Sequence, residues 1–249
     1  MDGIGILDIQ QINLMLTILQ VILFTIASTY LLYKSYKIKD KNIALVAIYI
    51  SFFAIFSYIS AINYFFYMLS GIDILPELDF LILFIFSAVG ITAWLLLFTN
   101  LLYKEKQKII VGIYIAYIAI YLCFTLIVII LGQRHLFGTG YTPDFELDFA
   151  PIYYIPVIIF TFIFIITGVI FIVNSLKTEN PVVKLKGITF LFYLIVSNIA
   201  SVFEFSFKIA IFLFISRALY VVAMFGLYIT FALPERIKNY ILKKKGWNV

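Results

Sequence analysis

Four polar side chains interrupt the apolar stretch 185–234, and they are the residues of this chain best placed to do chemistry. They are Asn198, Glu204, Lys208 and Arg217. Glu204 and Lys208 are four residues apart with the acid first, which is the favoured orientation for an ion pair on one helix. The spacing predicts a small polar cavity that binds a ligand or an ion through these four residues. The alternative is a salt bridge that fixes the outer ends of two helices.

Other chemistry is limited by residue type. His135 and Cys123 are the only residues of their kinds, which excludes a multi-histidine metal centre and a disulfide within the chain. Asp144, Glu146 and Asp148 alternate with apolar residues, a pattern that suits a short strand or a lid over one end of the protein. Their oxygens are ligands that Ca²⁺ accepts, but the spacing is not that of a calcium loop. We expect a solvated acidic rim and no metal site.

Several well-known catalytic motifs are absent from the sequence. The chain contains no P-loop, no Gly-x-Ser-x-Gly and no His-Glu-x-x-His. The last apolar segment, 212–233, contains no Lys that could form a Schiff base with retinal. We therefore expect neither an enzyme nor a bound cofactor.

The composition indicates a membrane protein. Of the 249 residues, 64% are hydrophobic and 12% are charged, whereas soluble domains are about 45–50% apolar and about 25% charged. The stretch 185–234 alone would form a helix of roughly 70 Å, and a bilayer core is about 30 Å thick. It must therefore fold back on itself and cross the membrane twice.

Seven apolar segments are long enough to span a bilayer as helices. They cover residues 12–33, 43–69, 80–103, 109–132, 152–176, 188–207 and 212–233. Apolar and polar residues do not alternate along them, as they would in the strands of a membrane barrel. The sequence thus predicts an all-α, seven-transmembrane helix bundle.

The basic residues predict the orientation of this bundle. Loops on one side carry 15 of the 18 Lys and Arg, namely Lys34, Lys37, Lys39, Lys41, Lys104, Lys106, Lys108, Lys177, Lys184, Lys186, Arg236, Lys238, Lys243, Lys244 and Lys245. By the positive-inside rule this side is cytoplasmic. The N-terminus is then outside, the C-terminus is inside, and the protein is a multi-pass plasma-membrane protein. The same lysines explain the positive net charge as attraction to anionic lipid head groups rather than to nucleic acid.

The chain divides into three parts on this basis. Residues 1–11 form a short external segment, 12–233 the seven-helix domain, and 234–249 a basic cytoplasmic tail. In the tail, Ile237, Tyr240 and Ile241 share one face of a helix, which predicts an amphipathic helix lying on the inner leaflet. The alternative is an ordinary basic anchor without a signalling role.

The last span ends in Leu227-Tyr-Ile-Thr-Phe-Ala-Leu-Pro-Glu-Arg-Ile237. With seven spans and this orientation, the chain resembles the seven-helix membrane sensor region of bacterial and archaeal histidine kinases, in which an aromatic-rich last span leaves the membrane through Pro and basic residues. In that group an output domain follows, whereas here about fifteen residues follow Pro234. The resemblance therefore implies either a sensor that signals through a separate cytoplasmic protein or a degenerate relative with another function.

Three functions fit these observations. The first is a receptor-like sensor that relays an external or membrane signal to a cytoplasmic partner. The second is a small transporter or channel with a polar path near the last two helices; such proteins have interrupted helices, for which Pro156, Gly90 and Gly226 are the candidate positions. The third is a membrane assembly subunit without a ligand.

Overall fold

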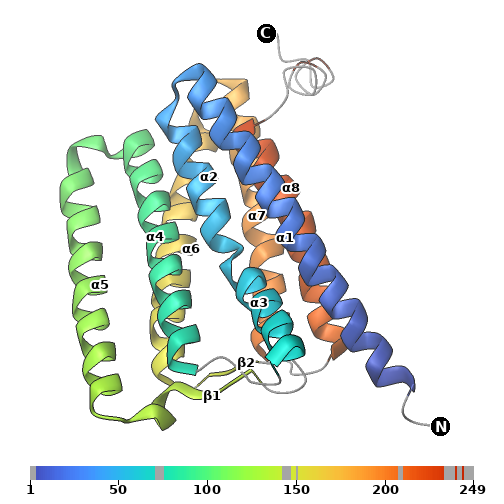
Figure 1. Cartoon of the computed structure of the whole chain (residues 1–249). Coiled ribbons are helices and arrows are strands. Elements are labelled where there is room, and N and C mark those ends of the chain that lie inside the picture. The colour runs from blue at the N-terminus through green and yellow to red at the C-terminus, as the bar shows by residue number, and fades with distance from the viewer. Residues whose placement is uncertain are drawn as a thin grey trace.

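The protein is a bundle of long helices with a small hairpin of two strands at one end (Figure 1). The computed structural model describes residues 4–70, 76–141, 147–149, 151–206 and 210–232, together with residues 239 and 243. The helices are α1 (Ile4–Ile38), α2 (Lys41–Phe53), α3 (Ile55–Ser70), α4 (Pro76–Leu102), α5 (Gln107–Ile130), α6 (Pro151–Lys177), α7 (Pro181–Ser206) and α8 (Ala210–Ala232). Two short 3-10 helices, η1 (Lys104–Lys106) and η2 (Arg134–Phe137), and the strands β1 (Gly138–Tyr141) and β2 (Leu147–Phe149) complete the described elements.

Six of these helices are long and apolar enough to cross a membrane. They are α1, α4, α5, α6, α7 and α8. Each coincides with one of the segments expected from the sequence, because every backbone group of an apolar segment finds its partner within a helix. The helical, membrane-type character of the chain is thereby confirmed.

The second expected segment, 43–69, is not one helix. It forms α2 and α3, which meet at Ala54 and follow one another along the bundle (Figure 1). The backbone N–H of Ala54 donates to the carbonyl of Ile50 at 3.2 Å. One turn earlier, the hydroxyl of Ser51 donates to the carbonyl of Ala47 at 3.0 Å, a contact that commonly bends helices. Neither Gly nor Pro lies within four residues of the break.

Small residues let several helices approach closely. A Cβ at Gly187 on α7 would lie 2.7 Å from the Cβ of Ser175 on α6. A Cβ at Gly90 on α4 would lie 2.9 Å from the Cβ of Phe52, two residues before the break between α2 and α3. Real Cβ atoms do not approach so closely, so both contacts require glycine. Such close contacts are the main source of helix association where lipid replaces water.

Aromatic side chains fill the middle of the bundle. Trp94 on α4 stacks on Phe190 of α7, with ring centroids 5.1 Å apart, and Tyr49 on α2 stacks on Phe164 of α6 at 5.5 Å. The hydroxyl groups of Tyr49 and Tyr193 are hydrogen-bonded at 2.9 Å. We call Tyr49, Trp94, Phe164, Phe190 and Tyr193 the aromatic layer. It joins α2, α4, α6 and α7 at their centre.

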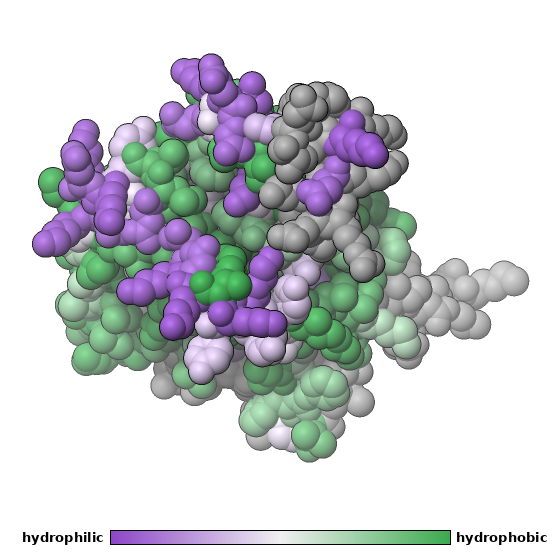
Figure 2. Space-filling model, turned by 90° about the horizontal axis from the view of Figure 1, so that it is seen from above, coloured by the Kyte–Doolittle hydropathy of each residue, from purple (hydrophilic) through white to green (hydrophobic). Residues whose placement is uncertain are grey.

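The two ends of the bundle differ in charge. The α1–α2, α4–α5 and α6–α7 connections meet at one end, and Figure 2 shows hydrophilic side chains gathered over it. The described lysines of these connections are Lys34, Lys37, Lys39, Lys41, Lys104, Lys106, Lys108, Lys177, Lys184 and Lys186. We call this the basic end. The antiparallel pair β1–β2 lies at the opposite end (Figure 1), so part of the sequence expected to form a strand there does so.

Candidate functional site

A cavity of about 150 Å³ lies between the helices, on the side of the aromatic layer away from the basic end. Side chains from α1, α2, α3, α4, α6, α7 and α8 line it. A dry cavity of about this volume holds a molecule the size of benzene. Among the described elements it is thus a partly open chamber of ligand size, lined by most of the helices of the bundle.

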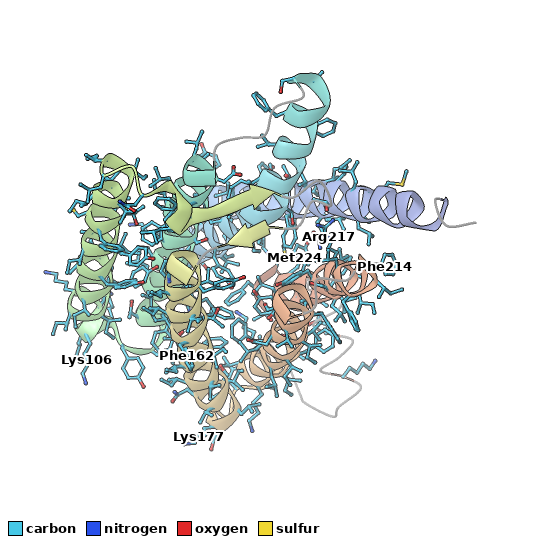
Figure 3. The ribbon with its side chains drawn as sticks, turned by 90° about the horizontal axis from the view of Figure 1, so that it is seen from below. Lys106, Phe162, Lys177, Phe214, Arg217 and Met224 are labelled. Atoms are coloured by element: carbon cyan, nitrogen blue, oxygen red, sulfur yellow. The ribbon has the colours of Figure 1, made fainter. Side chains whose placement is uncertain are left out.

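One wall of the cavity is a hydrogen-bonded cluster that joins α1, α3 and α8. The side-chain amide of Gln20 donates to the backbone carbonyl of Arg217 at 2.8 Å, and the hydroxyl of Ser57 donates to the amide oxygen of Gln20 at 2.9 Å. The guanidinium of Arg217 donates to the hydroxyl of Thr17. Figure 3 shows Arg217 where α8 faces α1. The side chains of Thr17, Gln20 and Arg217 are buried.

A second polar group comes from α7. Asn198 donates through its side-chain amide to the carbonyl of Leu194 at 2.7 Å. The hydroxyl groups of Ser201 and Tyr220 are 2.9 Å apart and bridge α7 to α8. All three side chains line the cavity. Together with the Gln20 cluster they make the α1, α7 and α8 side of the chamber polar.

The opposite wall is largely apolar. It is formed by Phe52 of α2, Ile91 of α4, and Val157, Phe160 and Phe164 of α6. The cavity is therefore two-sided, with donors and acceptors on one wall and rings and aliphatic chains on the other. Pockets of this kind orient a ligand through a few polar groups while its apolar part fills the rest.

The structure brings together two of the four site residues predicted from the sequence. Asn198 and Arg217 line the same cavity. Because α8 begins at Ala210, Arg217 lies seven residues along that helix, about 10 Å from its start at 1.5 Å per residue. Glu204 belongs to the last turn of α7, but its side chain is not described, and Lys208 lies outside the described residues. The ion pair between Glu204 and Lys208 stays a prediction.

The sequence reading missed the part of the site that comes from the first half of the chain. Thr17 and Gln20 are three residues apart on α1, so they share one face of an otherwise apolar helix. That spacing was a usable signal. Ser57 and Tyr49 gave no such signal in the sequence, because Ser and Tyr are common in membrane helices.

The structure describes only part of the acidic segment that was expected to form a solvated rim. Asp144 and Glu146 lie outside the described residues, and Asp148 belongs to β2 without a described side chain. Within the residues whose placement is described, no group of three His, Cys, Asp or Glu side chains could hold a metal ion.

These features define a class: a helical bundle of membrane type with a two-sided cavity on one side of an aromatic layer. No family model, no curated protein and no solved structure matches the chain. The cavity and its polar wall are therefore the features that bear on function.

Proposed function

We propose that the protein is a seven-pass receptor of the plasma membrane that binds a small molecule in the cavity and relays its presence to a separate cytoplasmic protein. In this proposal α2 and α3 together form one passage, the N-terminus is outside and the basic end is cytoplasmic. The observation that carries the proposal is the position of the cavity. It lies in the half of the bundle away from the basic end, where an external ligand would bind.

The aromatic layer supports a receptor rather than an open channel. Tyr49 and Phe164 line the cavity, and Trp94, Phe190 and Tyr193 pack directly behind them. Trp94, Phe190 and Tyr193 have exposed fractions of 1% or less. A packed layer of this kind closes a path toward the basic end, whereas a channel needs a continuous lining of water or polar groups.

Contacts beyond the layer offer a route for a signal. Phe190 packs against Phe171 of α6 and Phe231 of α8, with ring centroids 5.2 and 6.4 Å apart. The hydroxyl groups of Thr189 and Thr230 are 2.9 Å apart near the same level. A ligand that shifts Tyr49 or Phe164 would thus repack α7 against α8 next to the basic end. Discrete repacking of this type is how small movements at a site become larger ones elsewhere.

The proposal is tested by ligand-induced stabilisation of the purified protein. A library of small organic molecules is screened by thermal unfolding in detergent. A molecule present at a hundred times its Kd adds about 2.7 kcal/mol to the free energy of unfolding. We expect at least one such molecule to stabilise the wild type but not Asn198→Leu or Ser87→Phe, which alter opposite sides of the cavity. The lipid-facing variant Ile158→Phe serves as the matched control and should respond like wild type. If no molecule stabilises the wild type, an assembly subunit without a ligand becomes the better proposal.

A transporter is the second candidate, and the break at Ala54 favours it. Transporters bind their substrates where membrane helices are interrupted. Phe52 and Ser57, on either side of Ala54, both line the cavity. The positions proposed from the sequence do not interrupt their helices: α4 continues through Gly90, α6 through Pro156 and α8 through Gly226. Uptake of the stabilising molecule into proteoliposomes separates the two functions, since a transporter accumulates or equilibrates it and a receptor does not.

A further inference from the structure

The helices α6 and α7 pack closely near the basic end and lie farther apart on the other side of the aromatic layer (Figure 1 and Figure 3). Gly187 meets Ser175, and a Cβ at Gly168 would lie 3.4 Å from the Cδ1 of Leu194. Residues three, four or seven apart share a helix face. The faces that carry Gly168 and Leu194 therefore continue as Thr161 on α6 and Asn198 on α7. Thr161 is exposed and Asn198 half-buried, and both line the cavity.

The cavity is partly open, and the exposed Thr161 in its lining indicates that it opens to the side of the bundle between these two helices. We call the opening flanked by Thr161 and Asn198 the lateral gap. Thr161 is ten residues from the start of α6 and Asn198 eight residues from the end of α7, or about 15 and 12 Å along the helix axes. At that depth, a bilayer core of about 30 Å surrounds the helices with lipid tails.

The residues beside the lateral gap agree with a lipid environment. On α6, Ile158 is 52% exposed, and Phe162, which is labelled in Figure 3, is 61% exposed. On α7, Ile195 and Ile199 are 50% and 45% exposed. Large exposed apolar side chains on both flanks are suited to lipid and not to water. Thr161 is the polar residue among them, and it also lines the cavity.

We propose that the ligand is a small, membrane-dissolved amphiphile that reaches the cavity sideways through the lateral gap. This inference rests on the proposed function and names the ligand class of the same site. Its head carries hydrogen-bonding groups for the wall that includes Gln20, Asn198 and Arg217. Its body is a ring or a short alkyl chain that fits against Phe52 and Phe160. A molecule of this kind partitions into the bilayer before it binds, so the membrane concentrates it at the gap.

Trp94 provides a reporter beside the cavity. Its ring is 5.1 Å from that of Phe164 and 5.7 Å from that of Tyr49, both cavity residues, and its side chain is 1% exposed. The chain contains one other tryptophan, Trp247. In a Trp247→Phe background, fluorescence therefore reports on Trp94 alone. Bromine quenches tryptophan at close range, so 4-bromobenzyl alcohol, which has a hydroxyl head and a ring body, serves as the probe.

The experiment follows quenching of Trp94 in phosphatidylcholine vesicles after the probe is added from donor vesicles. We expect saturable quenching of the wild-type cavity. Thr161→Phe should slow its rate by at least about tenfold, which corresponds to roughly 1.4 kcal/mol of added barrier. Ile166→Phe adds the same side chain at a position that is 56% exposed and lies five residues away, on another face of α6, and it should leave the rate unchanged. Iodide, which stays in water, should not quench Trp94.

The outcomes separate the inference from the proposed function. If Thr161→Phe does not change the rate of saturable quenching, or if iodide quenches Trp94, access through the lateral gap is wrong. The cavity then remains a binding site. Absence of saturable quenching in the wild type overturns this ligand class. If a stabilising molecule is nevertheless found in the thermal screen, the receptor proposal still stands. Loss of final quenching in Ser87→Phe supports binding inside the cavity.

Discussion

Phe190 and Phe162 show how differently one residue type is used in this bundle. Phe190 is 0% exposed and touches Trp94, Phe164 and Tyr193, whereas Phe162 is 61% exposed. In soluble proteins Phe→Ala costs about 3–5 kcal/mol, part of which is transfer from water. In lipid the contribution from transfer out of water is largely absent, and the contribution from packing remains. We expect Phe190→Ala to cost about 2 kcal/mol and Phe162→Ala less than about 0.5 kcal/mol of unfolding free energy in bicelles. Equal effects would show that the aromatic layer does not hold the bundle together.

Gln20 is the residue on which the polar wall depends. Its amide group joins the backbone of Arg217 on α8 to Ser57 on α3. Hydrogen bonds inside membrane proteins are worth about 0.6 kcal/mol on average and at most about 1.7. We expect Gln20→Leu to lower the free energy of unfolding by about 1 kcal/mol. Gln133→Leu, at an exposed position after α5, is the matched control and should have no measurable effect. A neutral Gln20→Leu would mean that the cluster adds no stability.

At the scale of the elements, the contact between α6 and α7 depends on glycine. Gly187→Ala would place a Cβ 2.7 Å from the Cβ of Ser175, while Gly112→Ala on α5 meets nothing within 4 Å. Alanine favours a helix over glycine by about 1 kcal/mol. We expect Gly112→Ala to raise the Tm slightly and Gly187→Ala to lower it by several degrees. The double variant Gly187→Ala with Ser175→Gly should recover most of the loss, and failure to recover would place the cause outside this contact.

Most helices could be predicted from the sequence because their apolar segments exceed the length that lipid demands. Residues 80–103, 109–132 and 152–176 correspond closely to α4, α5 and α6. The break at Ala54 could not be predicted in the same way, because the neighbouring residues Ser51 to Tyr58 contain neither Gly nor Pro. The side-chain hydrogen bond of Ser51 lies just before the break, and Phe52 packs on Gly90 of another helix. The contact with Gly90 is tertiary, so the residue pattern of one segment does not reveal it.

At the scale of the whole molecule, the proposed orientation can be tested with single cysteines. In a Cys123→Ser background, Thr178→Cys lies between α6 and α7 at the basic end, and Gln133→Cys follows α5 at the opposite end. We expect a membrane-impermeant maleimide to label Gln133→Cys on intact cells. Thr178→Cys should react only after the membrane is opened. The reverse labelling pattern would show that the orientation is opposite to the proposed one. Labelling of both cysteines from outside would contradict the proposed seven passages.

The proposed cytoplasmic partner is tested with the tail. The tagged full-length chain and a chain truncated after Pro234 are crosslinked in their native membrane and purified. If the basic tail carries the signal, a soluble regulatory protein should accompany only the full-length chain. If both chains bring down the same membrane proteins and no soluble one, the assembly-subunit alternative gains support and the relay to a soluble partner is wrong.

Only the part of the candidate site that comes from a single apolar stretch could be predicted from the sequence. Asn198 and Arg217 stand out because they are polar residues within one apolar stretch. Thr17 and Gln20 are hydrogen-bonded to Arg217 across 200 and 197 residues of sequence, and Tyr49 lines the same cavity. Such pairings follow from how whole helices pack, which depends on the fit of many side chains at once. The spacing of residues shows which of them share a face of one helix. It does not show which other helix packs against that face.

The helix α5 stands at the edge of the bundle, packs mainly against α4, and contributes no residue to the cavity (Figure 1). In the proposed receptor, α5 would therefore contact lipid without contacting the ligand. The outward face of α5 can change freely with the thickness and lipid content of the host membrane while the chamber keeps its shape. An engineer who wished to move the protein to another membrane would change this helix first and leave the helices that line the cavity unchanged.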